Sequence, residues 1–399
     1  MAQSVAHVLG KDEATGSNPV VTSNRGESMN DTRVTTLANN LISHSCKLKK
    51  GQMLIIEGEA TAKDLIIAIV KRAYEIGAYP FVRLGDGQIG REVLMGVTEE
   101  YSKLACKYAK PLFEDAHAYI GIGVSNNVFE TSDVPVENKN IHTKFYGKPI
   151  HIDIRVKKTN WVILRYPNPS MAQLAQTSVE GFTNFFFDVC NLDYAKMHKA
   201  MLPLQKLIEK TDKVRIVADG TDLSFSIKGQ KAKICSGECN IPDGEIYTAP
   251  IKNSVNGVIK FNIPSLCKGI VHNDITLTFK DGKVVEESSS NTAALRNELD
   301  SDDGSRFTGE FAFGVNPFIT KPMYDTLFDE KMVGSIHIAL GSCYEDCSNG
   351  NKSQIHWDIV QSHMPEYGGG EIYFDDVLIR KDGMFLVKDL FALNPENLK

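Results

Sequence analysis

Histidine and carboxylate side chains occur in the second half of the chain at positions that suit a metal site. His356 and Asp358 are two residues apart in the strand-like run SQIHWDIV, so an extended backbone points both side chains to one face. Upstream, His337 lies in the apolar run SIHIALG, and Glu245 and Glu310 each follow a glycine at the start of a β-type run. Two imidazoles and three carboxylates would suit two divalent metal ions that share a bridging carboxylate and a bridging water.

Taken one at a time, these residues are weaker evidence for a metal site. A histidine in an apolar strand is more often a hydrogen-bonded core residue, and a Gly-Glu pair is usually a solvated strand entry. An imidazole beside a carboxylate is also found as a structural pair. The spacing alone therefore leaves both a metal site and a structural role open.

The first half of the chain has the order strand, helix, strand. The run MLIIEG (53–58) precedes a helical pattern that Thr61 and Asp64 would cap, and YPFVRL (79–84) restarts a strand. This is a βαβ unit, which implies a parallel sheet with covering helices. WVILRY (161–166) adds a further strand to this half.

The second half changes to many short β-type runs, which are KVRIVAD, LSFSIKG, EIYTAPI, VIKFNI and DITLTF. The Asp-Gly pairs within 280–283 and 381–384 predict hairpin turns between apolar stretches. A short helix is expected within the Ser- and Asn-rich stretch 288–305. The second half should therefore be β-rich.

These patterns together predict an α/β fold with two domains. Residues 30–210 form an N-terminal α/β domain with a partly parallel sheet, and residues 211–399 form a larger, β-rich α+β C-terminal domain that carries the metal site. Residues 1–29 show neither helical nor strand periodicity, and we predict that they are a disordered or non-native tail.

Composition narrows the class of protein. With 44 Lys and Arg against 50 Asp and Glu the formal charge is −6, which leaves no basic field for nucleic acid. The apolar runs are far shorter than the roughly 20 residues that cross a bilayer, and the N-terminus lacks the features of a secretory signal. We therefore expect a cytoplasmic protein that binds neither nucleic acid nor membranes.

The eight cysteines are too sparse for a disulfide scaffold. Cys235 with Cys239 and Cys343 with Cys347 share a spacing, and four thiolates could hold a structural zinc, although such sites usually have tighter pairs. Free thiols are the favoured interpretation.

Four runs in the second half resemble the metalloaminopeptidases of peptidase family M29, and they occur in the order NIPDGEIYTAP (240–250), TGEFAFG (308–314), HIALGSCY (337–344) and IHWDIV (355–360). The likeness also includes RYPNPSMAQLAQ at 165–176 and DGTDLSFSIKG at 219–229, and it covers most of the chain from about residue 50 onward.

The resemblance implies a residue-by-residue assignment of the site. The implied metal ligands are Glu245, Glu310, His337, His356 and Asp358. It also implies a catalytic Tyr344. As a physical hypothesis, we expect Tyr344 to donate a hydrogen bond to the oxyanion and Glu310 to assist proton removal from water. The family has a smaller α/β N-terminal domain and a C-terminal domain with two divalent metals (Zn, Co or Mn), and it forms homodimers whose active sites face an internal chamber. The resemblance therefore implies an aminopeptidase that removes N-terminal residues from peptides.

Two other functions remain as alternatives. Two histidines and one carboxylate, here His337, His356 and Asp358, also form the facial triad of mononuclear Fe(II) ring-cleaving dioxygenases. The presence of Glu245, Glu310 and Tyr344 favours the two-metal peptidase. A catalytically inactive peptide-binding relative is the second alternative, because fold does not establish function.

Overall fold

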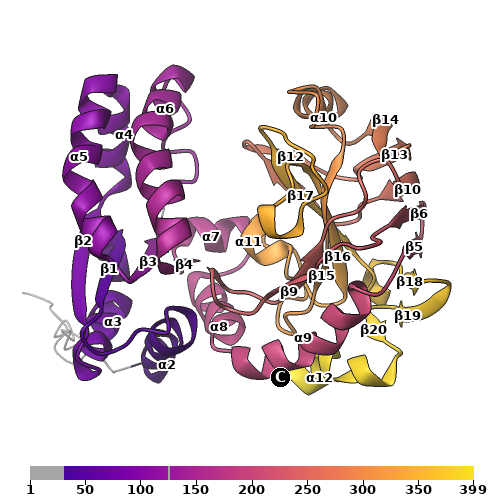
Figure 1. Cartoon of the computed structure of the whole chain (residues 1–399), viewed down its shortest axis with the longest axis horizontal. Helices are drawn as coiled ribbons and strands as arrows, with labels where there is room; N and C mark the ends of the chain where they lie inside the picture. The colour runs from indigo at the N-terminus through magenta and orange to yellow at the C-terminus, as the bar shows by residue number, and fades with distance from the viewer. Residues whose placement is uncertain (1–30, 125) are drawn as a thin grey trace, which may run out of the picture.

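The structure of the chain, a computed structural model, describes residues 31–124 and 126–399, so the predicted tail at 1–29 lies outside the described residues. Two lobes are evident (Figure 1), the first built around a parallel sheet and the second around two antiparallel sheets. The predicted α/β class is thereby confirmed. Among the described residues, no helix combines the length and apolar character needed to span a membrane.

The first lobe contains a five-stranded sheet in the order β2-β1-β3-β4-β8, in which every pair of neighbours is parallel. Its strands are β1 (Met53–Glu59), β2 (Tyr79–Gly85), β3 (Ala118–Gly123), β4 (Asn160–Arg165) and β8 (Asn240–Ile241). The order β1, α3 (Lys63–Glu75), β2 is the βαβ unit that the sequence predicts.

Helices cover this sheet and continue toward the second lobe. They are α2 (Thr32–Asn40), α3, α4 (Gly87–Met95), α5 (Glu99–Asp115), α6 (Val136–His142), α7 (Pro169–Leu174), α8 (Val179–Cys190) and α9 (Tyr194–Ile208). In Figure 1, α4, α5 and α6 rise above the parallel sheet, whereas α2 and α3 lie below it. In the described residues, η1 (Leu41–Ser45) and η3 (Thr143–Val156) are π-helical, and the 3-10 helices are η2 (Ala60–Ala62), η4 (Glu345–Cys347), η5 (Pro365–Tyr367) and η6 (Lys388–Leu393).

One predicted helix cap is wrong. The helix α3 begins at Lys63 after the turn η2, and its N-cap residue, Ala62, makes no side-chain hydrogen bond. Thr61 lies inside that turn and so does not occupy the N-cap position. Asp64 instead lies in the first turn of α3, where a negative charge stabilises the helix dipole.

The second lobe has a large antiparallel sheet of eight strands. In spatial order they are β14 (Lys283–Ser288), β13 (Thr276–Lys280), β10 (Asn256–Lys260), β6 (Thr221–Ser226), β5 (Lys213–Ala218), β18 (Glu371–Phe374), β19 (Val377–Lys381) and β20 (Met384–Phe385). Both predicted Asp-Gly hairpins are confirmed. Asp281 and Gly282 join β13 to β14, Asp382 and Gly383 join β19 to β20, and all four residues have positive φ.

A second antiparallel sheet of five strands packs on the large one. Its strands are β17 (His356–Ser362), β16 (Ser335–Gly341), β15 (Thr308–Gly314), β9 (Glu245–Thr248) and β7 (Lys233–Cys235). A small hairpin, β11 (Ser265–Cys267) and β12 (Ile270–His272), and the helices α10 (Thr292–Leu299), α11 (Thr326–Asp329) and α12 (Pro395–Leu398) complete the lobe. The helix α10 lies in the stretch where the sequence predicts one.

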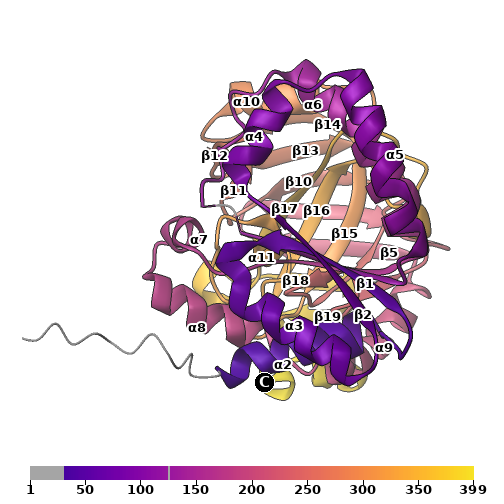
Figure 2. The same cartoon turned by 90° about the vertical axis from the view of Figure 1, so that its left-hand side faces the viewer.

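Aromatic side chains form the contact between the two antiparallel sheets. The rings of Phe311 and Phe225 lie 5.0 Å apart, and Phe313 lies 6.0 Å from both Phe374 and Phe385. Such pairs bury large apolar areas, so this face of β15 belongs to the core. In Figure 2, which looks from the first lobe, β15, β16 and β17 lie behind the parallel sheet. The opposite face of these strands therefore turns toward the first lobe.

The junction between the lobes is packed. The helix α9 contacts β7 and β9 of the second lobe, and α8 contacts α2 of the first. Arg165 at the end of β4 forms an ion pair with Asp325, which lies just before α11 (3.0 Å). The predicted domain boundary at residue 210, between α9 and β5, stays a prediction.

Candidate metal centre

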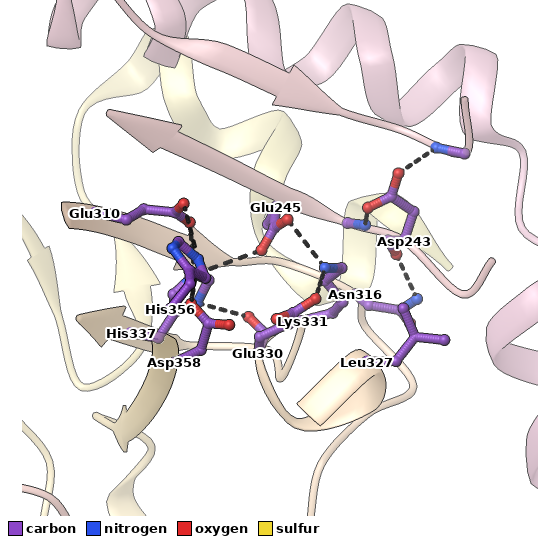
Figure 3. Close-up of polar contacts among 12 residues, drawn as sticks. Asp243, Glu245, Glu310, Asn316, Leu327, Glu330, Lys331, His337, His356 and Asp358 are labelled. Carbon is purple, nitrogen blue, oxygen red and sulfur yellow. Dashed lines mark hydrogen bonds and ion pairs between the residues drawn. The ribbon is translucent and has the colours of Figure 1, made fainter. Parts of the chain in front are cut away.

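Four adjacent strands of the five-stranded antiparallel sheet carry the predicted metal ligands. Glu245 begins β9, Glu310 lies in β15, His337 lies in β16, and His356 and Asp358 lie in β17. These strands are neighbours in the order β17-β16-β15-β9. Figure 3 shows their side chains converging on one region.

The strand register explains why these side chains share a face. Glu310 lies opposite Ala339, which lies opposite Asp358, and Ala312 lies opposite His337. Residues two apart on a strand point the same way, so the two alanines lie on the same face as the ligands. Their small side chains leave the space into which the longer carboxylates and imidazoles extend.

The five side chains come within a few ångströms of one another. His337 Nε2 lies 2.9 Å from Glu310 Oε1, 3.6 Å from Glu245 Oε2 and 3.9 Å from Asp358 Oδ1. His356 Nε2 lies 3.2 Å from Asp358 Oδ1 and 3.7 Å from Glu310 Oε2. The structure thus brings together all five residues that the sequence analysis nominates as ligands.

Backbone carbonyls determine which imidazole nitrogen faces the pocket. His337 Nδ1 lies 3.1 Å from the carbonyl oxygen of Glu330, and His356 Nδ1 lies 2.7 Å from that of Ser342. A carbonyl can only accept, so each Nδ1 is assigned as the N–H donor. The Nε2 atoms are then directed at the carboxylates, which is the arrangement found behind metal-binding histidines.

The electrostatics of the pocket favour cations strongly. Burial opposes charging of the imidazoles, yet the surrounding carboxylates raise the pKa of His337 to about 9 and that of His356 to about 10. Conversely, burial raises the pKa of Glu310, which lies beside Asp358 and Glu245. The field of these carboxylates therefore holds protons on bases that are ordinarily neutral at pH 7, and it would attract a metal cation by the same means.

The residues present fit a pair of divalent cations. Three buried carboxylate oxygens, Glu245 Oε2, Glu310 Oε2 and Asp358 Oδ1, make no hydrogen bond. Each of these oxygens has an imidazole Nε2 3.2 to 3.7 Å away but no hydrogen bond of good geometry, so a bound cation would satisfy it better. Ligand atoms lie within 4.8 Å of one another in one group of Glu245, Glu310 and His337 and in a second group of Glu310, His356 and Asp358. Glu310 belongs to both groups, as a bridging carboxylate would.

Tyr344 lies at the open side of this pocket. Its ring centre is 4.7 Å from that of His356 and 5.5 Å from that of Tyr247, and its side chain is 49% exposed. Burial and the nearby carboxylates raise the pKa of Tyr344, so its hydroxyl keeps its proton and can act as a hydrogen-bond donor.

A buried lysine beside the ligands is a feature that the sequence analysis missed. Lys331 is fully buried, its Nζ lies 2.9 Å from Glu245 Oε1, and it also contacts the carboxylate of Glu330. Burial opposes the charged form, but the two carboxylates raise the pKa of Lys331 well above its ordinary value. Lys331 and Glu245 are 86 residues apart in the chain, so no local pattern connects them.

The segment that leads into Glu245 is held by a second buried carboxyl group. Asp243 accepts hydrogen bonds from the backbone N–H groups of Gly237 (2.6 Å) and Gly244 (2.9 Å), and its own carbonyl accepts one from Asn316 Nδ2 (2.8 Å). Burial raises the pKa of Asp243 to about 7. These bonds, some of which are drawn in Figure 3, fix the start of β9.

The cysteines do not form the four-thiolate zinc site. All eight are free thiols, as favoured from the sequence, and among the described residues only Cys235 belongs to a candidate metal group, with Asp243 and Glu245.

A crevice of about 960 Å³ lies between the lobes. The carboxyl ends of β1 to β4 line one side of it, and the segment from Tyr324 to Leu327 lines the other. A much smaller cavity between this segment and β11 reaches Asp358. The segment before and within α11 therefore separates the crevice from the candidate metal centre.

Three comparisons of this chain with known proteins agree on one protein family. The sequence profile of the family described as thermophilic metalloprotease (M29) matches residues 30–385. The chain is 24% identical over 371 residues to aminopeptidase AmpS of Bacillus subtilis (strain 168), covering 84% of this chain and 90% of that protein. It is 25% identical over 375 residues to aminopeptidase T of Thermus aquaticus, covering 81% and 90% respectively. The solved structure of wild-type AmpT from Thermus thermophilus matches with a TM-score of 0.75 and 23% identity, over 89% of this chain and 99% of that one.

Proposed function

This chain belongs to the M29 family of thermophilic metalloproteases, and from that premise we propose that two divalent cations bound by its second lobe drive the release of N-terminal residues from peptides. Its relatives are aminopeptidases, so the chain is a metal-dependent aminopeptidase, a hydrolase of the exopeptidase class. The family resemblance of the sequence is confirmed. The observation that carries the two-cation proposal is that two of the three candidate groups of ligand atoms share Glu310.

In this proposal, the ligands divide between two positions. Glu245 and His337 would hold one cation, His356 and Asp358 would hold the other, and Glu310 would be shared between the two positions. A pair of cations supplies Lewis acidity for the scissile carbonyl and lowers the pKa of a water toward neutrality. Donors of this kind accept Zn, Co or Mn, and availability often decides among them.

The side chains of the pocket contribute the remaining chemistry. Glu310, shared between the two positions, would assist removal of a proton from the attacking water. Tyr344 keeps its hydroxyl proton and donates a hydrogen bond to the oxyanion that develops on the carbonyl. A neutral α-amine of the substrate would complete the site, which restricts cleavage to the first residue of a peptide.

The dioxygenase alternative is not favoured. It needs only two histidines and one carboxylate. Here Glu245 and Glu310 also lie in the pocket, each with a buried oxygen that makes no hydrogen bond. All the relatives named above are aminopeptidases.

The proposal extends to the assembly and location of the protein. We propose a homodimer that acts on peptides, as the family resemblance implies, and support for it comes from exposed apolar side chains on β2 and α4 of the first lobe. A cytoplasmic location is consistent with eight free thiols, since a reducing compartment preserves them.

The test is hydrolysis of a panel of aminoacyl-p-nitroanilides and short peptides by chelator-stripped protein to which Zn, Mn or Co is restored. We expect metal-dependent release of the N-terminal residue, and a loss of about 100-fold or more for Glu310→Gln, the range for a lost general base. The matched control is Glu371→Gln, which removes the carboxylate of β18 that forms an ion pair with Lys381 of β19. This variant should retain activity. If no metal restores peptidase activity and the protein binds a single iron, the proposal is wrong.

A further inference from the structure

A third group of metal-binding side chains adjoins the candidate metal centre, and a cation of the chain itself lies beside it. The ligand atoms of Cys235, Asp243 and Glu245 lie within 4.8 Å of one another. The ammonium of Lys331 contacts the carboxylates of Glu245 and Glu330 directly. Figure 3 shows the lysine between those two carboxylates. The negative charge on this side of Glu245 is therefore balanced by a lysine.

The two oxygens of Glu245 have different surroundings. Oε1 accepts a hydrogen bond from Lys331 Nζ at 2.9 Å, whereas Oε2 is buried, makes no hydrogen bond and lies 3.6 Å from His337 Nε2. A carboxylate that is held by one oxygen has its second oxygen fixed in direction. Lys331 thus points Oε2 of Glu245 at the candidate metal position.

The backbone around Lys331 is itself well held. Lys331 N donates to Phe328 O (3.0 Å) at the end of α11, and Lys331 O accepts from Asn316 N (3.0 Å). The preceding carbonyl, that of Glu330, accepts from His337 Nδ1. The backbone carbonyl of Glu330 therefore orients His337, and the side chain of Lys331 orients Glu245. These are the two residues that form a candidate metal group with Glu310.

Without the ammonium of Lys331 beside them, the carboxylates of the pocket would repel one another more strongly. Glu245 faces Glu310 across His337, and like charges at this separation in a buried site disfavour any compact arrangement of the ligands. Outer partners that orient metal ligands typically change metal affinity by 10- to 100-fold when they are removed.

We propose that Lys331 is a positioning residue of the metal centre: its ammonium presents Oε2 of Glu245 to the cation on the His337 side and so sets the affinity of that position. This inference rests on the two-cation function proposed above. It assigns the lysine no contact with substrate or with the reacting atoms.

The first test is Lys331→Met, which keeps the length of the side chain and removes the ammonium. Titration of chelator-stripped protein with Zn²⁺ in a calorimeter should show one cation bound as in the wild type and a second bound about 10- to 100-fold more weakly. The visible absorption of the Co²⁺-loaded protein, which reports ligand geometry, should change for the second equivalent of metal only. The matched control is Arg380→Met, because Arg380 is also fully buried but donates to Ser335 O and contacts none of the five ligands.

A second variant separates orientation from charge and guards against failure to fold. In Glu330→Gln/Lys331→Met, the loss of the lysine is matched by the loss of the neighbouring carboxylate, so the net charge of the pair is unchanged. The backbone carbonyl of residue 330 remains available to His337. The second cation should again bind about 10- to 100-fold more weakly in this variant.

The outcomes distinguish this inference from the function on which it rests. If wild-type protein binds fewer than two cations, the two-cation function is wrong. If the wild type binds two, and both lysine variants bind two with unchanged or higher affinity, only the role of Lys331 is wrong. An equal weakening in Arg380→Met would also overturn that role, since it would show a general effect of losing a buried cation.

Discussion

Buried carboxyl groups occur in this chain in two settings, and only one of them suits a metal. In the candidate metal centre, oxygens of Glu245, Glu310 and Asp358 lie near imidazoles and make no hydrogen bond. Asp329, at the end of α11, is equally buried, but its Oδ1 accepts a hydrogen bond from Met323 N at 2.6 Å. A carboxyl group whose acceptors are filled by the backbone has a structural role.

Asp329 should make stability depend on pH. Burial raises its pKa from 3.8 to about 8, so the folded state holds the proton more tightly than the unfolded state does. Its contribution to the free energy of unfolding is then fully present below pH 3.8 and is lost as pH rises toward 8. Between pH 5 and pH 9 the melting temperature of the wild type should fall by several degrees more than that of Asp329→Asn.

The comparison needs a control in which an exposed carboxylate is changed. Asp303→Asn is suitable because Asp303 lies at the surface near the loop after α10. The melting temperature of Asp303→Asn should change with pH as that of the wild type does. A profile of Asp329→Asn parallel to that of the wild type would contradict the prediction.

At the residue scale, the sequence was informative where chemistry is local. The pair His356 and Asp358 could be nominated because two residues on one strand must share a face. The other three candidates, Glu245, Glu310 and His337, were supported mainly by family resemblance. Lys331 could not be nominated, because its role depends on a partner 86 residues away.

At the scale of strands, the position of Glu310 depends on an irregularity in β15. Thr308 lies opposite Leu340 and Glu310 opposite Ala339, so Gly309 is an extra residue between them. Such a bulge changes the direction of the following side chain. A Cβ on Gly309 would lie 2.4 Å from the carbonyl oxygen of Ser342, so only glycine fits there.

Gly309→Ala should therefore disturb both stability and metal binding. The clash is with backbone, so β15 must shift, at an expected cost of about 2 kcal/mol in the free energy of unfolding. The carboxylate of Glu310 would shift with it, and both cations should bind more weakly. Urea unfolding and calorimetric titration with Zn²⁺ measure the two effects.

Gly147→Ala provides the comparison for this prediction. A Cβ on Gly147, in η3, would meet no atom closer than 3.9 Å, so this substitution should leave metal affinity unchanged. If Gly309→Ala bound metal as tightly as the wild type, the bulge would not be what directs Glu310.

The elements themselves were predicted unevenly. The βαβ unit, the two hairpins and the strands that carry the ligands were evident because hydrophobic alternation and Asp-Gly turns are local signals. The strand β3 (Ala118–Gly123) was missed although it is a short apolar run, since such a run is also compatible with a buried helix. The π-helix η3 could not be predicted from hydrophobic periodicity or turn residues, because its hydrogen-bond pattern depends on how it packs.

At the scale of the whole molecule, the first lobe exposes an apolar surface. The strand β2 is at the edge of its sheet, and α4, which follows it, has no buried residue. Ile89 (67% exposed) and Val93 (38%) lie one turn apart on α4, and Leu84 at the end of β2 is also exposed. Apolar surfaces of this kind usually mark a site of association, which is consistent with the proposed homodimer.

A double substitution on this surface should shift the oligomeric state. Ile89→Glu/Val93→Glu places two charges on α4 and should convert a dimer to a monomer, as measured by analytical ultracentrifugation. Val377→Glu, at an exposed apolar residue of β19 in the other lobe, should leave the dimer intact. A monomeric wild type would contradict the proposed homodimer.

The strand β8 gives the two lobes a mechanical connection. Asn240 and Ile241 pair with Ile163 and Leu164 of β4 and so belong to the parallel sheet of the first lobe. Only three residues separate Ile241 from Glu245, which begins β9 in the second lobe. Because this connection is so short, a shift of the first lobe relative to the second would displace the carboxylate of Glu245. Metal occupancy and the pairing of β8 with β4 are then thermodynamically linked, so a cation held by Glu245 would also stabilise the contact between the lobes.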